Sequence, residues 1–597
     1  MESIPDADIL KLIDEMSEET GGTDDVYSAM CSFFSAKSEQ LSECGEPGLA
    51  EAAATLASIT HMALDAESRN EPIVPAFVLI DKRSVSPADL HPAQRAFLEA
   101  LYPALETGLL KSRIAEVSLL LDTPRRWELV DEIIAGYLRE PLSEQDWMMR
   151  QQAFWTRAVV LSRQFSKKDP IQHIEAQIDR YLDEHGPGNE GISFQLLNFV
   201  RRQLFQRSNA EKNAARVMSL ASHQKSHKNY QMAERFFLLA EDFYKLIRNQ
   251  AGYVSAIFES AECLFLEAES RALVSDMGNM IASQIYEQAL QRYRRIPAPN
   301  RNAFNADEQI VECLRRIRMH GELSLDEMHA YQLPPCDVSE MASVAVNHVR
   351  DKRDIFEASL YFVGLQIITS ESTQENDEKK QFRLSELFGA VYMSGDGRAV
   401  GRTGITGKDH ARVRQQQLFD ISLQVAVTGH ILPAMHRLIQ EYNLTLPYFE
   451  ELCHCSPLVP ENRMTLTARG LYLGFEYRFS ESIHLLSPQV EFLVRSLLKR
   501  GGVITSTINE AGIETEVGLS SLLDKAEAKT LLGDELHFNL ASLFTDPFGA
   551  NIRNYVAHGL LNDYSSESDA VIYAWWLYLK IIVSSVTEMP LIRIPNT

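Results

Sequence analysis

Apolar residues recur at steps of three and four through most of the first 330 residues of the chain. Segments such as YPALETGLLKSRIAEVSLLLD and EPLSEQDWMMRQQAFWTRAVVLSRQFS keep this spacing over several turns. The spacing matches the period of an α-helix, and the alternation typical of strands is scarce. The pattern predicts a mainly α protein in which residues 1–330 form a helical scaffold or regulatory region.

Two segments of this region resemble each other. AERFFLLA begins at Ala233 and ASQIYEQA begins at Ala282, and both follow A-x-x-x-[FY]-x-x-A. The small residues let two helices approach closely and the aromatic fills the gap, as in the second helix of a tetratricopeptide repeat, although the period of roughly 34 residues is missing. Residues 228–297 are therefore predicted to form helical hairpins of repeat-like character, which hold a protein partner or pack on the rest of the chain.

Residues 331–460 are predicted to form a second, mostly helical region. It opens at LPPCDVSEM, where two prolines end the preceding helix. Its glycine-rich stretch, residues 390–408, is predicted to be a β-hairpin turning at SGDG, because Asp-Gly between alternating residues favours such a turn. The stretch also contains GITGK, so nucleotide binding at Gly395–Lys408 is the alternative. Against it, Arg402 and Asp409 stand where a phosphate-binding loop needs Gly and Ser or Thr.

Residues 461–597 are predicted to form a compact bundle of four or five helices. Two helices meet near LLSP, a short hairpin insertion turns at NEAG, and a third helix ends before the D-P-F-G break. The last helix, SDAVIYAWWLYLKIIVSSV, is apolar on all sides, which is typical of a buried helix. Its aromatic residues are therefore expected in the core or in a dimer contact rather than as platforms for bases: Tyr573, Trp575, Trp576 and Tyr578.

Several bounds follow from composition. The length of 597 residues indicates more than one domain. No window holds the roughly 18 consecutive apolar residues of a membrane-spanning helix, and the acidic N-terminus does not resemble a secretory signal. Seven cysteines, an odd number, fit free thiols in a reducing compartment. The sequence thus predicts a soluble, cytoplasmic protein with no membrane partner.

The charge of the chain limits which partners it can bind. A formal net charge of −24 argues against broad, unspecific binding to nucleic acid, because phosphate attraction needs a positive surface. A small basic cleft remains compatible with this charge.

One cluster resembles half of a zinc site. Cys453, His454 and Cys455 are consecutive in ELCHCSP, but no second pair of ligands accompanies them, and a structural zinc ion needs four. A packed loop is the preferred interpretation. No metal and no cofactor are expected.

The segment GANIRNYVAHGLL carries the candidate chemistry. A short helix is expected to begin near Asn551 as its N-cap and to end at Gly559. Arginine binds phosphate through two parallel hydrogen bonds, and histidine side chains transfer protons near neutral pH. Arg553, Asn554 and His558 therefore form a candidate site for phosphodiester cleavage. The alternative is a structural role, with Arg553 paired to Asp546 or Asp563.

RNYVAHG resembles the RNxxxHG motif of the DUF4209 family and the R-x(4–6)-H motif of the HEPN superfamily, with the resemblance extending over about Leu466 to Val586. The resemblance implies a HEPN-like bundle and metal-independent RNA cleavage, often by a dimer, leaving 2′,3′-cyclic phosphate ends. By position, Arg553 and His558 match the catalytic pair and Asn554 the polar residue after the arginine. The resemblance also suggests a bacterial anti-phage defence or toxin setting, and the superfamily includes non-catalytic binding members.

These observations leave two functional hypotheses. The first is an endoribonuclease acting on RNA, including tRNA, as a homodimer through the C-terminal bundle, because one motif per chain supplies one histidine. Arg495, Lys499 and Arg500 would edge its RNA cleft, although Glu491 and Arg495 are also spaced for an ion pair on one helix. The second is a non-catalytic scaffold. A His558 that lies in a solvent-open cleft favours the enzyme, and a fully buried one with both ring nitrogens bonded favours the scaffold.

Overall fold

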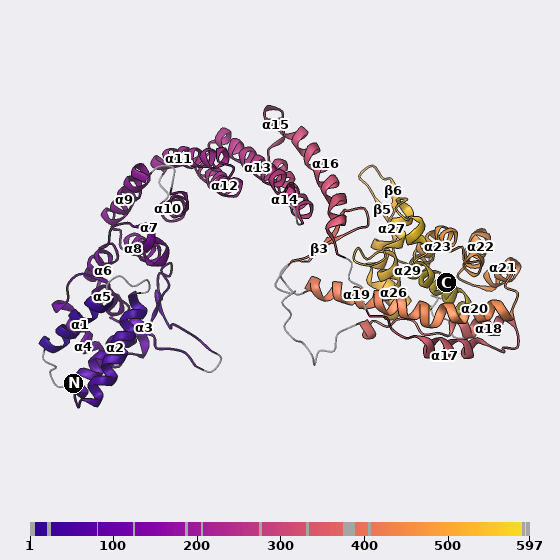
Figure 1. Ribbon diagram of the computed structural model, residues 1–597, viewed down its shortest axis with the longest axis horizontal. Coiled ribbons are helices and arrows are strands. Elements are labelled where there is room, and N and C mark those ends of the chain that lie inside the picture. The colour runs from indigo at the N-terminus through magenta and orange to yellow at the C-terminus, as the bar shows by residue number, and fades with distance from the viewer. Residues whose placement is uncertain are drawn as a thin grey trace. The chain divides into compact units, whose positions relative to one another are not determined.

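The computed structural model describes residues 6–20, 26–79, 82–122, 126–185, 189–204, 207–273, 277–329, 334–373, 389–403, 408–587 and 592. The expectation of a mainly α protein is confirmed: the described residues form mostly helices, with three small antiparallel β-hairpins (Figure 1). The chain divides into two compact units, Met1–His320 and Gly321–Thr597. Residues of the expected central and C-terminal regions contribute to one shared hydrophobic core in the second unit.

The helices of unit 1 follow one another along the chain, most of them through short turns and α3 and α4 through a longer connection that contains a β-hairpin. Their bounds are α1 (Asp6–Thr20), α2 (Val26–Glu43), α3 (Pro47–His61), α4 (Pro92–Leu101), α5 (Leu109–Leu121), α6 (Val130–Tyr137), α7 (Glu144–Asp146), α8 (Gln152–Gln164), α9 (Asp169–His185), α10 (Glu190–Gln203), α11 (Arg207–Ser226), α12 (Tyr230–Ile247), α13 (Gln250–Ala272), α14 (Gly278–Arg294), α15 (Ala298–Arg301) and α16 (Ala306–Ser324), which contains the boundary. One small hairpin pairs β1 (Ala63–Leu64) with β2 (Ile73–Val74).

The A-x-x-x-[FY]-x-x-A segments occupy the contacts between successive helices of unit 1. Helices α11 to α14 stack side by side (Figure 1). All six pattern positions are fully buried: Ala233, Phe237, Ala240, Ala282, Tyr286 and Ala289. The small residues at these positions therefore allow the helices to approach each other closely.

A charged cluster lies in the core of unit 1. The Glu116 carboxylate, fully buried, accepts from Arg157 Nε at 2.5 Å and from the Tyr137 hydroxyl at 2.5 Å. Burial raises the pKa of Tyr137 well above its ordinary value, so the phenol keeps the proton that it donates. Arg113, also fully buried, places its guanidinium 4.0 Å from the Tyr27 ring centroid. Glu116 thus compensates Arg157, whereas the three guanidinium nitrogens of Arg113 are buried and have no hydrogen-bond partner among the described residues, in a region where unpaired charge is costly.

Unit 2 packs its helices around one central helix. Their bounds are α17 (Ser339–Val349), α18 (Ile355–Val363), α19 (Lys408–Ala426), α20 (Leu432–Glu441), α21 (Leu446–Cys455), α22 (Met464–Phe475), α23 (Phe479–Arg500), α24 (Leu519–Leu523), α25 (Ala526–Leu532), α26 (Asp534–Phe544), α27 (Ile552–Ala557), α28 (Asp563–Ser566) and α29 (Asp569–Ser585). Its hairpins pair β3 (Val391–Met393) with β4 (Ala399–Arg402), and β5 (Ser506–Ile508) with β6 (Glu514–Glu516).

The central helix of unit 2 is α29. Tyr573, Trp575, Trp576 and Tyr578 are all buried there, so the core interpretation of these aromatics is confirmed. The indole of Trp575 donates to the Leu471 carbonyl at 2.9 Å. A Cβ at Gly474 would lie 2.1 Å from this indole, so the close approach of α22 to α29 requires glycine at that position.

The hairpin of β3 and β4 turns at Ser394–Gly397, where the Gly397 amide donates to the Ser394 carbonyl at 2.9 Å. Gly397 has a φ of +78°, which favours glycine. The turn predicted at SGDG is thus present, and residues 404–407 of the predicted stretch lie outside the described residues.

One helical segment among the described residues, His410–Glu441, is long and apolar enough by composition to cross a membrane. It comprises α19, a π-helical turn at Val427–Ile431 and α20. Its buried residues include Phe419, Leu423 and Val427, which belong to the core of unit 2. Packing thus covers part of its apolar surface, and 39% of its most apolar window is buried.

Lys580 is a buried lysine on α29. Its ammonium donates to the carbonyls of Val363 and Leu365 at the end of α18, the latter at 2.7 Å. A cation there satisfies carbonyls that have no partner within their own helix. Burial lowers the pKa of Lys580 to about 8.

Lys580 should make unfolding pH-dependent. Its pKa is about 8 in the folded state and near the ordinary 10.5 in the unfolded state, so between these values the unfolded chain binds the extra proton. The free energy of unfolding should therefore rise with pH through this window, by up to about 2 kcal/mol between pH 8 and 10. Urea titrations at both pH values should show this rise in the wild type and less of it in Lys580→Met. An equal rise in both proteins would contradict the assignment.

Candidate functional site

Helix α27 carries the predicted motif, but its start differs from the expectation. Asn551 has a φ of +47° and makes no side-chain cap. Its Oδ1 instead accepts from Asn554 Nδ2 at 2.8 Å. Gly559, with a φ of +64°, ends the helix as predicted. Because α27 has only six residues, its N-terminal dipole adds little to anion binding.

Arg553 is held by a carboxylate from another helix. Its Nε donates to Glu491 Oε2 of α23 at 2.9 Å, and its Nη1 donates to Asn554 Oδ1 at 3.2 Å. The partners considered from sequence, Asp546 and Asp563, are not the ones it uses: Asp546 pairs with Arg412 at 3.0 Å. The structure thus ties α27 to α23 through a half-buried ion pair.

The ion pair continues along α23. Glu491 Oε1 accepts from Arg495 Nη2 at 2.7 Å, as the spacing predicted. Arg495 Nη1 in turn contacts Glu516 Oε2 of β6 at 2.8 Å. Lys499 also contacts Glu516. Alternating charges therefore run from α27 to the β5–β6 hairpin.

A hollow of about 320 Å³ lies between α23, α27 and the start of α22. Its charged lining consists of Arg463, Arg495 and Arg553 against the single carboxylate of Glu491. Its apolar lining includes Pro488 and Phe492. Three guanidiniums against one carboxylate give the hollow a positive character that suits a bound anion.

His558 is the C-cap of α27 and follows Ala557, which lines the hollow. Its side chain is exposed. Within the part of the chain that the structure describes, its ring has no hydrogen bond or ion pair. The condition set for an enzyme, a ring in a solvent-open cleft, is met only in part: the ring is open to solvent and available for proton transfer, but it does not line the hollow.

The six predicted site residues are brought together only in part. Arg553 and Arg495 line the same hollow, and Asn554 supports Arg553. Lys499 and Arg500 lie at the end of α23 and do not line it; Arg500 donates to the Pro457 carbonyl at 3.4 Å. Sequence reasoning missed Arg463 and Phe492. No motif marks them, and only the fold places them beside α27.

A larger hollow of about 830 Å³ lies near the other end of α27. Its lining includes four carboxylates, those of Asp420, Asp563, Glu567 and Asp569, and no basic residue. Like charges repel, so this hollow does not suit a phosphate.

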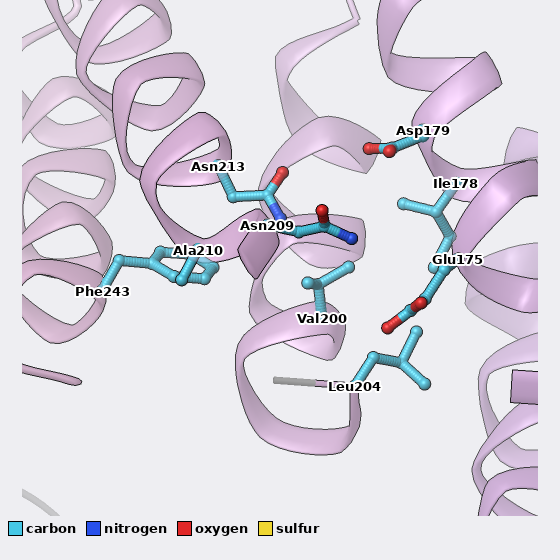
Figure 2. Close-up of a pocket in the computed structure, with 9 residues that line it drawn as sticks. All are labelled: Glu175, Ile178, Asp179, Val200, Leu204, Asn209, Ala210, Asn213 and Phe243. Carbon is cyan, nitrogen blue, oxygen red and sulfur yellow. The ribbon is translucent and has the colours of Figure 1, made fainter. Parts of the chain in front are cut away.

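Figure 2 shows a third hollow, within unit 1, between α9, α10, α11 and α12. Glu175, Asp179, Asn209 and Asn213 surround it, but its volume of about 10 Å³ has room for no more than a water molecule. It is too small for a substrate.

Two other sites were considered from sequence, a metal site at Cys453–Cys455 and a nucleotide-binding loop at Gly395–Lys408. Cys453 is buried and Cys455 exposed on α21, so their thiols do not converge. Among the described residues, no group of three or more His, Cys, Asp or Glu side chains is placed to hold a metal ion. For nucleotide binding at Gly395–Lys408, residues 404–407 lie outside the described residues.

Comparison with known families corrects the family expectation. Residues 10–174 match the model of DUF7380, a domain of unknown function. No curated protein matches the chain. The expectation of a DUF4209 or HEPN-like domain is wrong, because the family model that matches is DUF7380. Four fixed residues in a seven-residue window, with helices around them, carry too little information to define a family. The defence or toxin setting rested on that resemblance alone and loses its support.

Proposed function

We propose that the chain is a metal-independent endoribonuclease, in which Arg553 binds the scissile phosphate, His558 transfers a proton and Asn554 orients Arg553. The observation that carries the proposal is the exposed, unbonded His558 ring at the end of the helix whose Arg553 lines the arginine-rich hollow. RNA supplies its own nucleophile, the 2′-hydroxyl. Cleavage therefore requires a cationic group that binds the phosphate and a group that transfers a proton.

The reaction balances with the groups named. His558 accepts the proton of the 2′-hydroxyl, the 2′-oxygen bonds to phosphorus, and the bond from phosphorus to the 5′-oxygen breaks. The products are a 2′,3′-cyclic phosphate and a 5′-hydroxyl. The leaving oxygen needs a proton, which a second histidine supplies if two copies of the chain join through their C-terminal bundles. A homodimer is therefore part of the proposal.

The contact between Glu491 and Arg553 opposes the binding of a phosphate. A phosphate entering the hollow competes with this carboxylate for Arg553. Arg495 keeps Glu516 and the Val517 carbonyl as further partners, whereas the polar contact of Arg463 is the neutral side chain of Gln489, at 3.0 Å. Arg463 is thus the guanidinium of the hollow that is least committed to carboxylates.

The proposed cellular location is the cytoplasm. All seven cysteines are free thiols, as expected in a reducing compartment. The stacked helices α11 to α14 would serve there as the surface for a protein partner that controls access to RNA.

Incubation of the purified chain with mixed tRNA in EDTA tests the proposal. We expect cleavage to products with 2′,3′-cyclic phosphate ends, and no cleavage of a DNA strand of the same sequence, because DNA lacks the 2′-hydroxyl. Equal cleavage of RNA and DNA, or no cleavage by folded protein at any concentration that allows dimers, would contradict it.

A scaffold is the second candidate, and the Arg553–Glu491 contact is the observation that favours it. An ion pair joining α27 to α23 is what a structural motif would contribute. On that account Arg553→Ala lowers the melting temperature and alters nothing else. On the enzymatic account it removes cleavage in protein that remains folded by circular dichroism.

A further inference from the structure

We infer that the arginine-rich hollow also contains a base-binding subsite, in which an unpaired nucleobase next to the scissile phosphate stacks on the guanidinium of Arg463, which the Phe492 ring supports from behind. The inference rests on the proposed function, since it specifies single-stranded RNA as the substrate. The inference is drawn from Arg463 and Phe492, which line the hollow and which the proposed phosphate contact at Arg553 does not use.

The subsite is a guanidinium that lies on an aromatic ring, so that a base stacks on the outer face of the guanidinium. The guanidinium carbon of Arg463 lies 3.9 Å from the centroid of the Phe492 ring, so the two planes are in contact. Arg463 is held there by Gln489 Oε1 at 3.0 Å. Both Arg463 and Phe492 are half-buried and line the hollow. Guanidinium planes and aromatic rings are the groups on which proteins stack unpaired bases.

The rest of the hollow separates apolar from charged contacts. Pro488 and Val556 add apolar lining, whereas Arg553 and Glu491 supply the charged part. A nucleotide has the same division, with a flat base and an anionic phosphate. The volume of about 320 Å³ lies at the lower limit for small-ligand sites, which fits one nucleotide.

This arrangement selects unpaired RNA. In a duplex both faces of a base are covered by its neighbours, so the base cannot reach a protein platform unless it leaves the stack. The subsite also does not distinguish one base from another by hydrogen bonding, because stacking accepts every base. We expect preference for single strands with little preference for sequence.

Binding measured with probes that cannot be cleaved tests the subsite separately from catalysis. The probes are fluorescent 2′-O-methyl oligoadenylates of roughly ten nucleotides, in three forms: single-stranded, paired with a complement, and with the bases removed. The full-length chain should bind the single strand more tightly than the duplex and the abasic strand. Phe492→Leu and Arg463→Lys should each weaken binding of the single strand about 5- to 150-fold. Neither should change binding of the abasic strand.

Phe538→Leu is the matched control, because Phe538 is also a half-buried aromatic of unit 2 but lies outside the lining of the hollow. It should leave binding of all three probes unchanged. Equal weakening on the abasic strand, unchanged binding by both variants, or equal affinity for the duplex would overturn the inference. Base-dependent binding that needs Phe492, in a chain that cleaves no RNA, would leave the subsite standing and reject the nuclease.

Discussion

Replacing His558 with alanine should lower the rate of RNA cleavage about a hundredfold or more, because a positioned acid–base group contributes at least that much to such reactions. The same substitution should leave the melting temperature unchanged, since the ring is exposed and makes no bond within the described residues. The cleavage rate is measured with enzyme in excess over labelled tRNA, so that only the chemical step and binding contribute.

His454→Ala is the control for His558→Ala. His454 is also an exposed histidine of unit 2, on α21, and it does not line the hollow. Its replacement should leave the cleavage rate as it is. Equal rates for His558→Ala and the wild type would remove His558 from the mechanism. A fall in melting temperature with His558→Ala would show that the ring has a structural role.

Replacing Glu116 with glutamine should destabilise unit 1 by about 3–5 kcal/mol, because it removes the carboxylate that compensates the buried Arg157. Arg157 is 1% exposed and Glu116 is fully buried, so water does not replace the lost partner. Calorimetry of the whole chain should show the transition of unit 1 at a lower temperature while that of unit 2 stays in place.

Two further variants separate the charge effect from packing. Glu116→Met combined with Arg157→Met should destabilise less than Glu116→Gln alone, because a pair replaced by apolar groups leaves fewer buried charges unpaired. Glu15→Gln removes the partner of Lys37 on the exposed face of α1 and should hardly change the transition. If Glu116→Gln and Glu15→Gln have the same small effect, the cluster does not hold unit 1 together.

The sequence predicts the helical fold well because periodicity reports local geometry. The A-x-x-x-[FY]-x-x-A segments predicted which residues would be buried between helices, and the all-apolar last helix predicted the centre of unit 2. It did not predict the cluster around Glu116. Arg157 lies 41 residues from Glu116. The sequence by itself does not distinguish a charged residue that is buried from one that is exposed.

The site could be predicted only where it is local. Arg553, Asn554 and His558 lie within one short segment, whereas Glu491 lies 62 residues from Arg553. The packing of α23 against α27 creates both the ion pair and the hollow, and no spacing along the chain encodes that packing. For the same reason Arg463 and Phe492 had no sequence signal. The expected N-cap at Asn551 failed because its side chain bonds to the Asn554 side chain instead.

The central claim is that Arg553 and His558 act together in one cleavage step. The most direct test is the rate at which the Arg553→Ala, His558→Ala double variant cleaves tRNA in EDTA, beside each single variant and the wild type. Groups that act as one unit are not additive, so the double variant should be about as slow as the slower single variant. The wild type should yield 2′,3′-cyclic phosphate ends. Cleavage by the folded double variant at the wild-type rate would contradict the claim.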